Sequence, residues 1–408
     1  MKRLLLATAL LFSGAVSFGQ NINDHKINFN YIQLPLLKID TQFDQYDVKV
    51  EHAYLQANED STTMFQARQA VALQFFQEAS ARYYREIDSL DRMHLQSMAA
   101  WEKSVNSGTT NPDGTALAQP VAPVYPQPPV LENVEAPILH SNYEETQVEQ
   151  RINLAGYEKG EEEVEITIII HPIRNIRILS EKKGTGAETK YEYKARYVLP
   201  IGLRVANPAQ GIMMETTLYE GEMTYNMATQ TSQYDHELFM MDNRETFYRQ
   251  LETHARQNAL SRTNDHLNNH FGFVELSRRA EIYSVKSFKG FDYSDVTNAF
   301  TQTNLALQQV GSDRNRSSAI AQINMAINAT EAILAESNLN DKKSRINSKI
   351  TAMLQCNLAE LYVWKADFNK ADGLANLAMN SGEGKAKRHI RDEMGFYKDQ
   401  RNRWDVHY

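Results

Sequence analysis

Residues 106–137 hold seven of the eleven prolines in this chain of 408 residues. Proline has no backbone N–H and a fixed φ angle, so such a stretch is excluded from helix interiors and from central strands. The sequence therefore predicts an extended linker at 106–137 that separates two β-rich regions. The run Val-Tyr-Pro-Gln-Pro-Pro leaves a proline-rich ligand as the alternative to a spacer.

Residues 61–105, just before this linker, have the periodicity of one long amphipathic helix. Apolar residues recur there at spacings of three and four among Glu, Arg and Gln: Phe65, Ala72, Phe76, Ala79, Tyr83, Ile87, Leu90, Met98 and Trp101. At about 1.5 Å per residue such a helix reaches on the order of 60 Å, which is longer than a compact domain requires. Two interpretations stay open, a packing helix and a projecting arm that binds a partner.

Strand patterns lie on both sides of the helix and the linker. Residues 20–60 contain two predicted strands, and residues 138–232 contain several more, separated by Gly-rich or Asn-Pro turns. Tyr191, Tyr193 and Ala195 alternate with charged residues, which predicts one buried and one solvated face. We therefore expect a β-sandwich-like domain that carries residues 61–137 as an insertion.

Helical periodicity returns after the strands and continues to the C-terminus. The predicted fold is α+β, a β-sandwich-like domain with a long helical and proline-rich insertion followed by an α-helical domain. The expected units are a signal peptide (1–19), N-terminal strands of the β domain (20–60), a long amphipathic helix (61–105), the proline-rich linker (106–137), a β-rich domain (138–232), a helix pair with a return strand (233–291) and a helical domain (292–408).

The segment 358–379, LAELYVWKADFNKADGLANLAM, has the spacing of two antiparallel helices joined by a short turn. Small alanines allow the helices to approach closely, and Tyr362 and Phe368 fill the gap at the turn. The segment resembles a tetratricopeptide-like repeat, and a companion lies at 317–334. The equivalent alanines of the two copies are 52 residues apart, against a usual period of about 34, so the array is atypical.

This resemblance implies a scaffold that binds a protein partner. The candidate contact residues on the expected concave surface are Tyr362, Trp364 and Phe368. The alternative is that all three belong to the core.

The first residues predict export. Lys2 and Arg3 precede the apolar run LLLATALLF and a small-residue cleavage site ending at Gly19. This signal peptide resembles those of Bacteroidota envelope proteins. No later stretch approaches ~20 apolar residues, so we expect no transmembrane segment after cleavage. The only cysteine, Cys356, is far from the cut, which leaves no lipoprotein anchor. The expected location is the periplasm, with the outer-membrane periphery and the medium as alternatives.

Few residues in the sequence point to chemistry. His266 and His270 are spaced i, i+4, but the segment HLNNH lacks a general-base Glu and no third ligand is indicated, so we expect neither a metal nor another cofactor. The basic residues are dispersed in a chain of net charge −8, which argues against nucleic acid. Nucleophile-elbow, phosphate-loop and dinucleotide motifs are absent, which favours a protein that is not an enzyme.

The leading hypothesis is therefore a non-enzymatic periplasmic adaptor or scaffold within an outer-membrane assembly or a secretion machine. A rival hypothesis is an envelope hydrolase or carbohydrate-active protein with a site in the β domain near His171, His236 or His254. A structural surface component is the third alternative.

Overall fold

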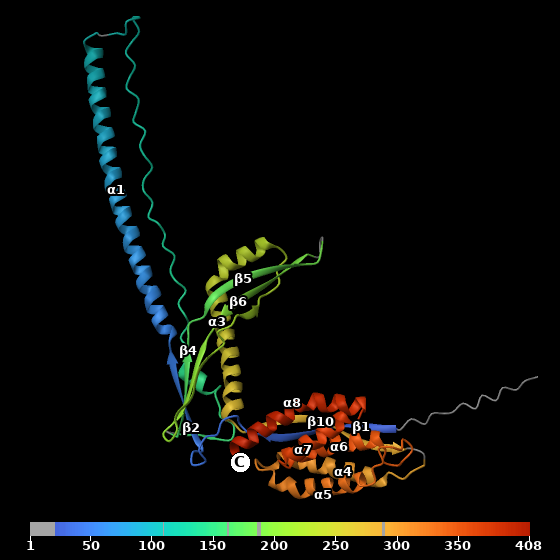
Figure 1. Cartoon of the computed structure of the whole chain (residues 1–408). Helices are drawn as coiled ribbons and strands as arrows, with labels where there is room; N and C mark the ends of the chain where they lie inside the picture. Colours follow the sequence, from blue (N-terminus) through green and yellow to red (C-terminus); the bar gives the residue numbers. More distant parts are fainter. Residues whose placement is uncertain (1–20, 109, 161–162, 186–188, 288–289) are drawn as a thin grey trace, which may run out of the picture.

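A long arm, a β-rich middle and a helical base follow one another through the molecule (Figure 1). The computed structural model describes residues 21–108, 110–160, 163–185, 189–287 and 290–408. The predicted signal peptide, 1–19, lies outside the described residues. Within the described ranges, none of the helices combines the length and the apolarity needed to cross a bilayer.

The arm consists of helix α1 (Tyr54–Asn106) and the segment 110–140, most of it extended, which returns alongside the helix (Figure 1). We call this returning segment the strap. The helix predicted over 61–105 is confirmed, and it begins seven residues earlier. Its 53 residues give a length of about 80 Å. The helix projects instead of packing on the domain.

Two sheets form the β-rich middle. The larger one has the strand order β3-β2-β4-β7-β8, and the smaller one has the order β5-β6-β9. The elements are β2 (Gln45–His52), α2 (Glu145–Glu149), β3 (Glu158–Lys159), β4 (Val164–Ile170), β5 (Arg174–Lys183), β6 (Lys190–Val198), β7 (Ile201–Asn207), β8 (Gly211–Leu218), β9 (Met223–Asn226) and α3 (Gln233–Phe271). Buried side chains of both sheets and of α3 share one hydrophobic core.

Strands β2 and β4 are parallel neighbours, with Tyr46 opposite Val164 and His52 opposite Ile170. A parallel pair cannot be closed by a tight hairpin and needs a long crossover connection. The arm and α2 lie in that connection. The arm is therefore rooted at the ends of two central strands.

The helical base contains the chain's first described strand as well as its last helices. Strand β1 (Asn21–Gln33) pairs antiparallel with β10 (Val274–Ser287) along its whole length. The helices are α4 (Ser294–Gln309), the 3₁₀ turn η2 (Val310–Ser312), α5 (Ser317–Leu334), α6 (Ser348–Trp364), α7 (Phe368–Asn380) and α8 (Gly384–His407).

This pairing corrects the expectation that both strands of 20–60 belong to one β domain. Ile27, Phe29 and Tyr31 alternate along β1 and are buried in the helical core, whereas β2 joins the five-stranded sheet. The return strand in 233–291 likewise pairs with β1 and not with the larger sheet. The combination of helices and sheets is confirmed, while a sandwich and a tetratricopeptide-like repeat stay predictions.

Candidate protein-interaction surface

The strap lies on α1 with a three-residue period that holds from 117 to 129 and, after a shift, from 134 to 140. Its half-buried side chains are Leu117, Pro120, Pro123, Pro126, Pro129, Val134, Pro137 and His140. Three residues per turn is the repeat of a polyproline II helix, so side chains at this spacing share one edge. That edge carries five prolines and is the less exposed edge of the strap, which runs alongside α1 (Figure 1). An extended strap residue advances about 3.1 Å, against about 1.5 Å for a helical residue. Roughly 27 strap residues therefore match the length of α1, which has 53 residues.

The predicted apolar stripe of α1 is the surface that the strap covers. Of the nine stripe residues, Ala72 is buried, Ala79 is exposed and the other seven are half-buried. Polar contacts fix the register, because Trp101 Nε1 donates to the carbonyl of Leu117 at 3.0 Å and the Tyr125 hydroxyl donates to Asp91 Oδ1 at 2.5 Å. The strap thus takes the place of a second helix.

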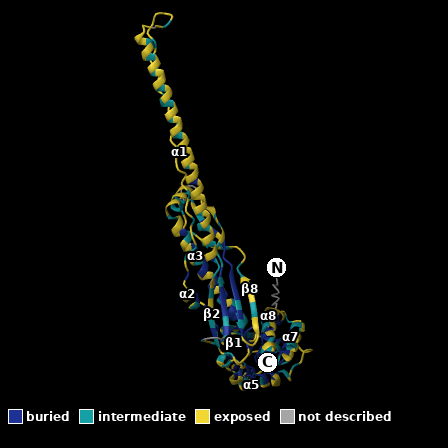
Figure 2. Ribbon diagram, turned by 90° about the vertical axis from the view of Figure 1, so that its left-hand side faces the viewer, coloured by how far each residue is buried: buried dark blue, intermediate teal, exposed yellow. Residues whose placement is uncertain are grey.

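A large set of apolar side chains on the arm stays uncovered. Val121, Val124 and Val130 on the outer edge of the strap are 88–90% exposed. The exposed large hydrophobic residues of α1 are Leu55, Met64, Val71, Leu73, Phe75, Tyr84, Met93, Leu95 and Val105. More than half of such residues in the described chain lie on the arm, which Figure 2 shows mostly in the colour of exposed residues.

This exposure is not explained by folding of the arm itself. Only Tyr54 and Ala72 of α1 are buried. Helices in proteins owe most of their stability to the packing of an apolar face. Extended apolar surface on a folded protein marks an interaction site more often than chance placement. The outward side chains of the arm are therefore the candidate functional site.

Buried charges fix the direction of the arm at its base. The root cluster, as we call it, contains His140, Glu252, Arg256, Tyr54 and Tyr143. Glu252 Oε1 lies 3.0 Å from His140 Nδ1 and accepts from Arg256 at 2.7 Å, while Glu252 Oε2 accepts from the Ser141 N–H at 2.9 Å. The Arg256 guanidinium also lies over the Tyr54 ring, 4.5 Å from its centroid. The cluster ties α1, the end of the strap and α3 together.

The electrostatics of the root cluster favour the ionised pair. Burial acts to raise the pKa of Glu252, but the hydrogen bonds and charges of His140 and Arg256 outweigh it and lower the pKa below its ordinary value. Burial lowers the pKa of Arg256, which still leaves the guanidinium charged at neutral pH. The Glu252–Arg256 pair is ionised, hydrogen-bonded and buried. Its contacts with His140 and Ser141 fix the end of the strap to α3.

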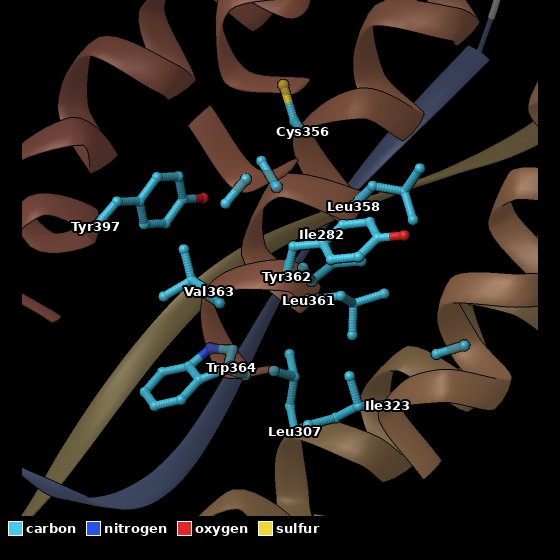
Figure 3. Packing of buried hydrophobic residues seen from close by; sticks show 14 of the residues in the cluster. Ile282, Leu307, Ile323, Cys356, Leu358, Leu361, Tyr362, Val363, Trp364 and Tyr397 are labelled. Atoms are coloured by element: carbon cyan, nitrogen blue, oxygen red, sulfur yellow. The ribbon is translucent and has the colours of Figure 1, made fainter. Parts of the chain in front are cut away.

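The structure corrects the predicted partner-binding residues. Tyr362, Trp364 and Phe368 are 2%, 0% and 7% exposed, because all three belong to the hydrophobic core of the base. Figure 3 shows Tyr362 and Trp364 within that core. Trp364 donates its Nε1 proton to Glu360. Burial raises the pKa of the neighbouring Cys356 thiol to about 12, as befits an inert core cysteine. These three aromatic residues form core and present no surface to a partner.

His266 and His270 are close, with ring centroids 4.2 Å apart. His270 Nδ1 is engaged by the carbonyl of His266 at 2.8 Å, and burial lowers the pKa of His266. In the described ranges, no group of three His, Cys, Asp or Glu side chains is arranged to hold a metal ion.

The histidines of the rival hypothesis do not meet in one site. His236 stacks on Tyr193 with centroids 3.6 Å apart, and His254 Nε2 is hydrogen-bonded to Asn258 on its own helix at 2.7 Å. Neither they nor His171 line the cavity of about 450 Å³ at the base of the arm. Sequence inspection missed this root cavity and the root cluster, because their parts come from four separate segments.

Comparison of the chain with known protein families, curated proteins and solved structures gives no match. The candidate site therefore rests on the geometry of the arm.

Proposed function

We propose that this protein is a non-enzymatic scaffold or adaptor that binds a protein partner along the arm. The observation that carries the proposal is the row of uncovered apolar side chains on α1 and on the outer edge of the strap. In water such a surface is unfavourable, and covering it with a partner is favourable by about 25 cal/mol for each Å² of apolar area, before the entropy cost of association is subtracted. The predicted export places this binding in the bacterial envelope, within an outer-membrane assembly or a secretion machine.

The rigidity of the arm supports this role. The strap is rich in proline and loses little conformational entropy on binding. The root cluster holds the base of the arm to α3 through ionised hydrogen bonds. An arm of about 80 Å that is already ordered can reach a partner without a large ordering cost.

The proposed partner-binding surface lies on the arm and not on the helical base. The aromatic residues that were expected to bind a partner in the base are buried, whereas Phe75 and Leu95 on α1 are each 67% exposed. The enzymatic alternative has less support, since its candidate histidines lie apart and have partners of their own.

A shortened arm tests the proposal. Ala72 and Val134 line the same small cavity, so the helix and the strap are adjacent at that level. Excising residues 73–131 and joining the ends with a short Gly-Ser linker keeps the root cluster intact. In envelope extracts, full-length tagged protein should migrate in a larger assembly on size-exclusion chromatography, and the shortened protein should migrate alone. Co-migration of the shortened protein with the same assembly would contradict the proposal.

A further inference from the structure

The root cavity lies where the arm meets the β-rich middle. Its volume of about 450 Å³ is within the range of small-molecule sites. Its walls come from α1, the end of the strap, the start of β5 with the loop before it, and α3. The apolar part of the lining is formed by Met64, Phe65, Ile138, Leu139, Ile173, Ile176 and Tyr248.

The charges around this cavity do not balance. Three arginines line it, Arg68, Arg244 and Arg249, against two carboxylates. Glu135 is paired with Arg244, and Glu252 is held by His140 and Arg256. Both carboxylates are therefore already matched, so the lining keeps an excess of positive charge in a chain whose net charge is −8.

Arg68 is the arginine best placed to meet a ligand. Arg244 pairs with Glu135 and Arg249 with Glu245, whereas Arg68 has no hydrogen bond or ion pair to any described residue. It also lines the adjoining cavity of about 570 Å³ along α1. An exposed guanidinium at the junction of two cavities presents its N–H groups to whatever enters either one. Its planar fork matches the two oxygens of a carboxylate.

We propose that the root cavity binds a single-chain anionic amphiphile, an acyl chain with a carboxylate head. The chain lies among the isoleucine side chains of the strap and of the segment that leads into β5, and the carboxylate pairs with Arg68. A ligand in this position contacts the arm and the β-rich middle at once. Of the outward side chains of the arm, only Met64 also lines the root cavity, so binding of the ligand can be measured separately from binding of the partner.

Octanoate, octanol and octylamine test the head-group requirement on the full-length protein. Titration calorimetry, run below the micellar concentrations of octanoate and octylamine and below the solubility limit of octanol, should give saturable binding of octanoate. That binding should be severalfold tighter than the binding of octanol, as expected for one ion pair with an exposed arginine. Octylamine should bind more weakly than octanol. Octanoate binding no tighter than octanol, or no saturable binding, would overturn the proposal.

Two variants and a control locate the ligand. Arg68→Gln should abolish the preference for octanoate over octanol while leaving octanol binding unchanged. Arg82→Gln, an exposed change on the same helix outside the cavity, should keep the preference. Ile138→Gln, at a strap residue that is 36% exposed, should weaken both compounds severalfold and equally. Unchanged melting temperatures establish that the variants fold. Equal effects of Arg68→Gln and Arg82→Gln would place the ligand elsewhere.

Discussion

Helices α1 and α6 use their residues in opposite ways. Helix α6 has 17 residues, of which 14 are buried, whereas α1 has 53 residues with two buried. Helix α6 is enclosed by β1, β10 and the other helices of the base, and α1 contacts little besides the strap. Helix α6 is part of the folded core, whereas α1 projects away from the core.

This contrast has an energetic consequence. Burial of apolar area is the dominant favourable term in folding, so substitutions in α6 should act on stability and substitutions on the outer face of α1 should not. If the arm is an interface, its side chains should act on association instead. Substitutions in the two helices, at the root of the arm and in the strap test that division.

The largest effect is expected for Trp364→Ala. Trp364 is fully buried, packs edge-on against Phe29 and Tyr31, and donates to Glu360. Its truncation should lower the free energy of unfolding by about 4 kcal/mol, because it leaves a large cavity and removes one of the hydrogen bonds to the buried Glu360. Urea denaturation measures this change.

The matched substitution on the arm is Phe75→Ala. Phe75 is 67% exposed, so the substitution should change the free energy of unfolding of the protein by less than about 0.5 kcal/mol. A loss of 2 kcal/mol or more would mean that the arm contributes to the stability of the fold, and the contrast between the helices would fail.

The next largest effect is expected at the root of the arm. Glu252→Gln removes the negative charge that faces Arg256, which is 2% exposed. Breaking a buried pair in this way should cost about 3 kcal/mol. Hydrogen exchange of the backbone at 140–143 should accelerate more than exchange in α6. Equal acceleration in both regions would show that the root does not act as a local anchor.

The same carboxyl group predicts a pH dependence. The folded-state pKa of Glu252 is lowered, so its contribution is complete above the unfolded-state pKa of about 4.3. The contribution is lost as the pH falls through the folded-state value. The stability difference between the wild-type protein and Glu252→Gln should therefore shrink below about pH 4. A constant difference between pH 7 and pH 3 in urea titrations would contradict this assignment.

The sequence predicted the long helix and the extended strap because both are local patterns. The stripe from Phe65 to Trp101 reports a helical period, and the density of prolines excludes other structure. The three-residue spacing from Pro120 to Pro129 was also present in the sequence. This spacing places the prolines on one edge of a polyproline II segment, which is the half-buried edge of the strap.

The remaining features depend on pairing over long distances. Strand β1 meets β10 across more than 240 residues, and alternation alone cannot identify the partner of a strand. His140 and Glu252 come together in the same way. The alanine-rich segment around Phe368 has a local pattern that fits either core or surface aromatic residues. These residues are buried because β1, which is distant in the sequence, belongs to the same core.

The smallest effect is expected within the strap, where Pro126→Ala and Pro128→Ala form a matched pair. Pro126 lies on the edge that faces α1 and is half-buried, whereas Pro128 is exposed. Both changes should alter the free energy of unfolding by less than about 1 kcal/mol. Only Pro126→Ala should increase proteolytic cleavage of the strap, because only that residue packs on the helix. Equal cleavage of the two variants would argue against the three-residue contact pattern.

Site-specific photocrosslinking in cells tests whether the arm is the partner-binding surface. A photoreactive amino acid replaces Leu95 or Val124 on the arm, or in a matched control Leu377 on the base, which is 58% exposed. Leu95 and Val124 should give covalent adducts with the same partner protein, and Leu377 should give none. Adducts at Leu377 without adducts at Leu95 or Val124 would show that the arm is not the partner-binding surface.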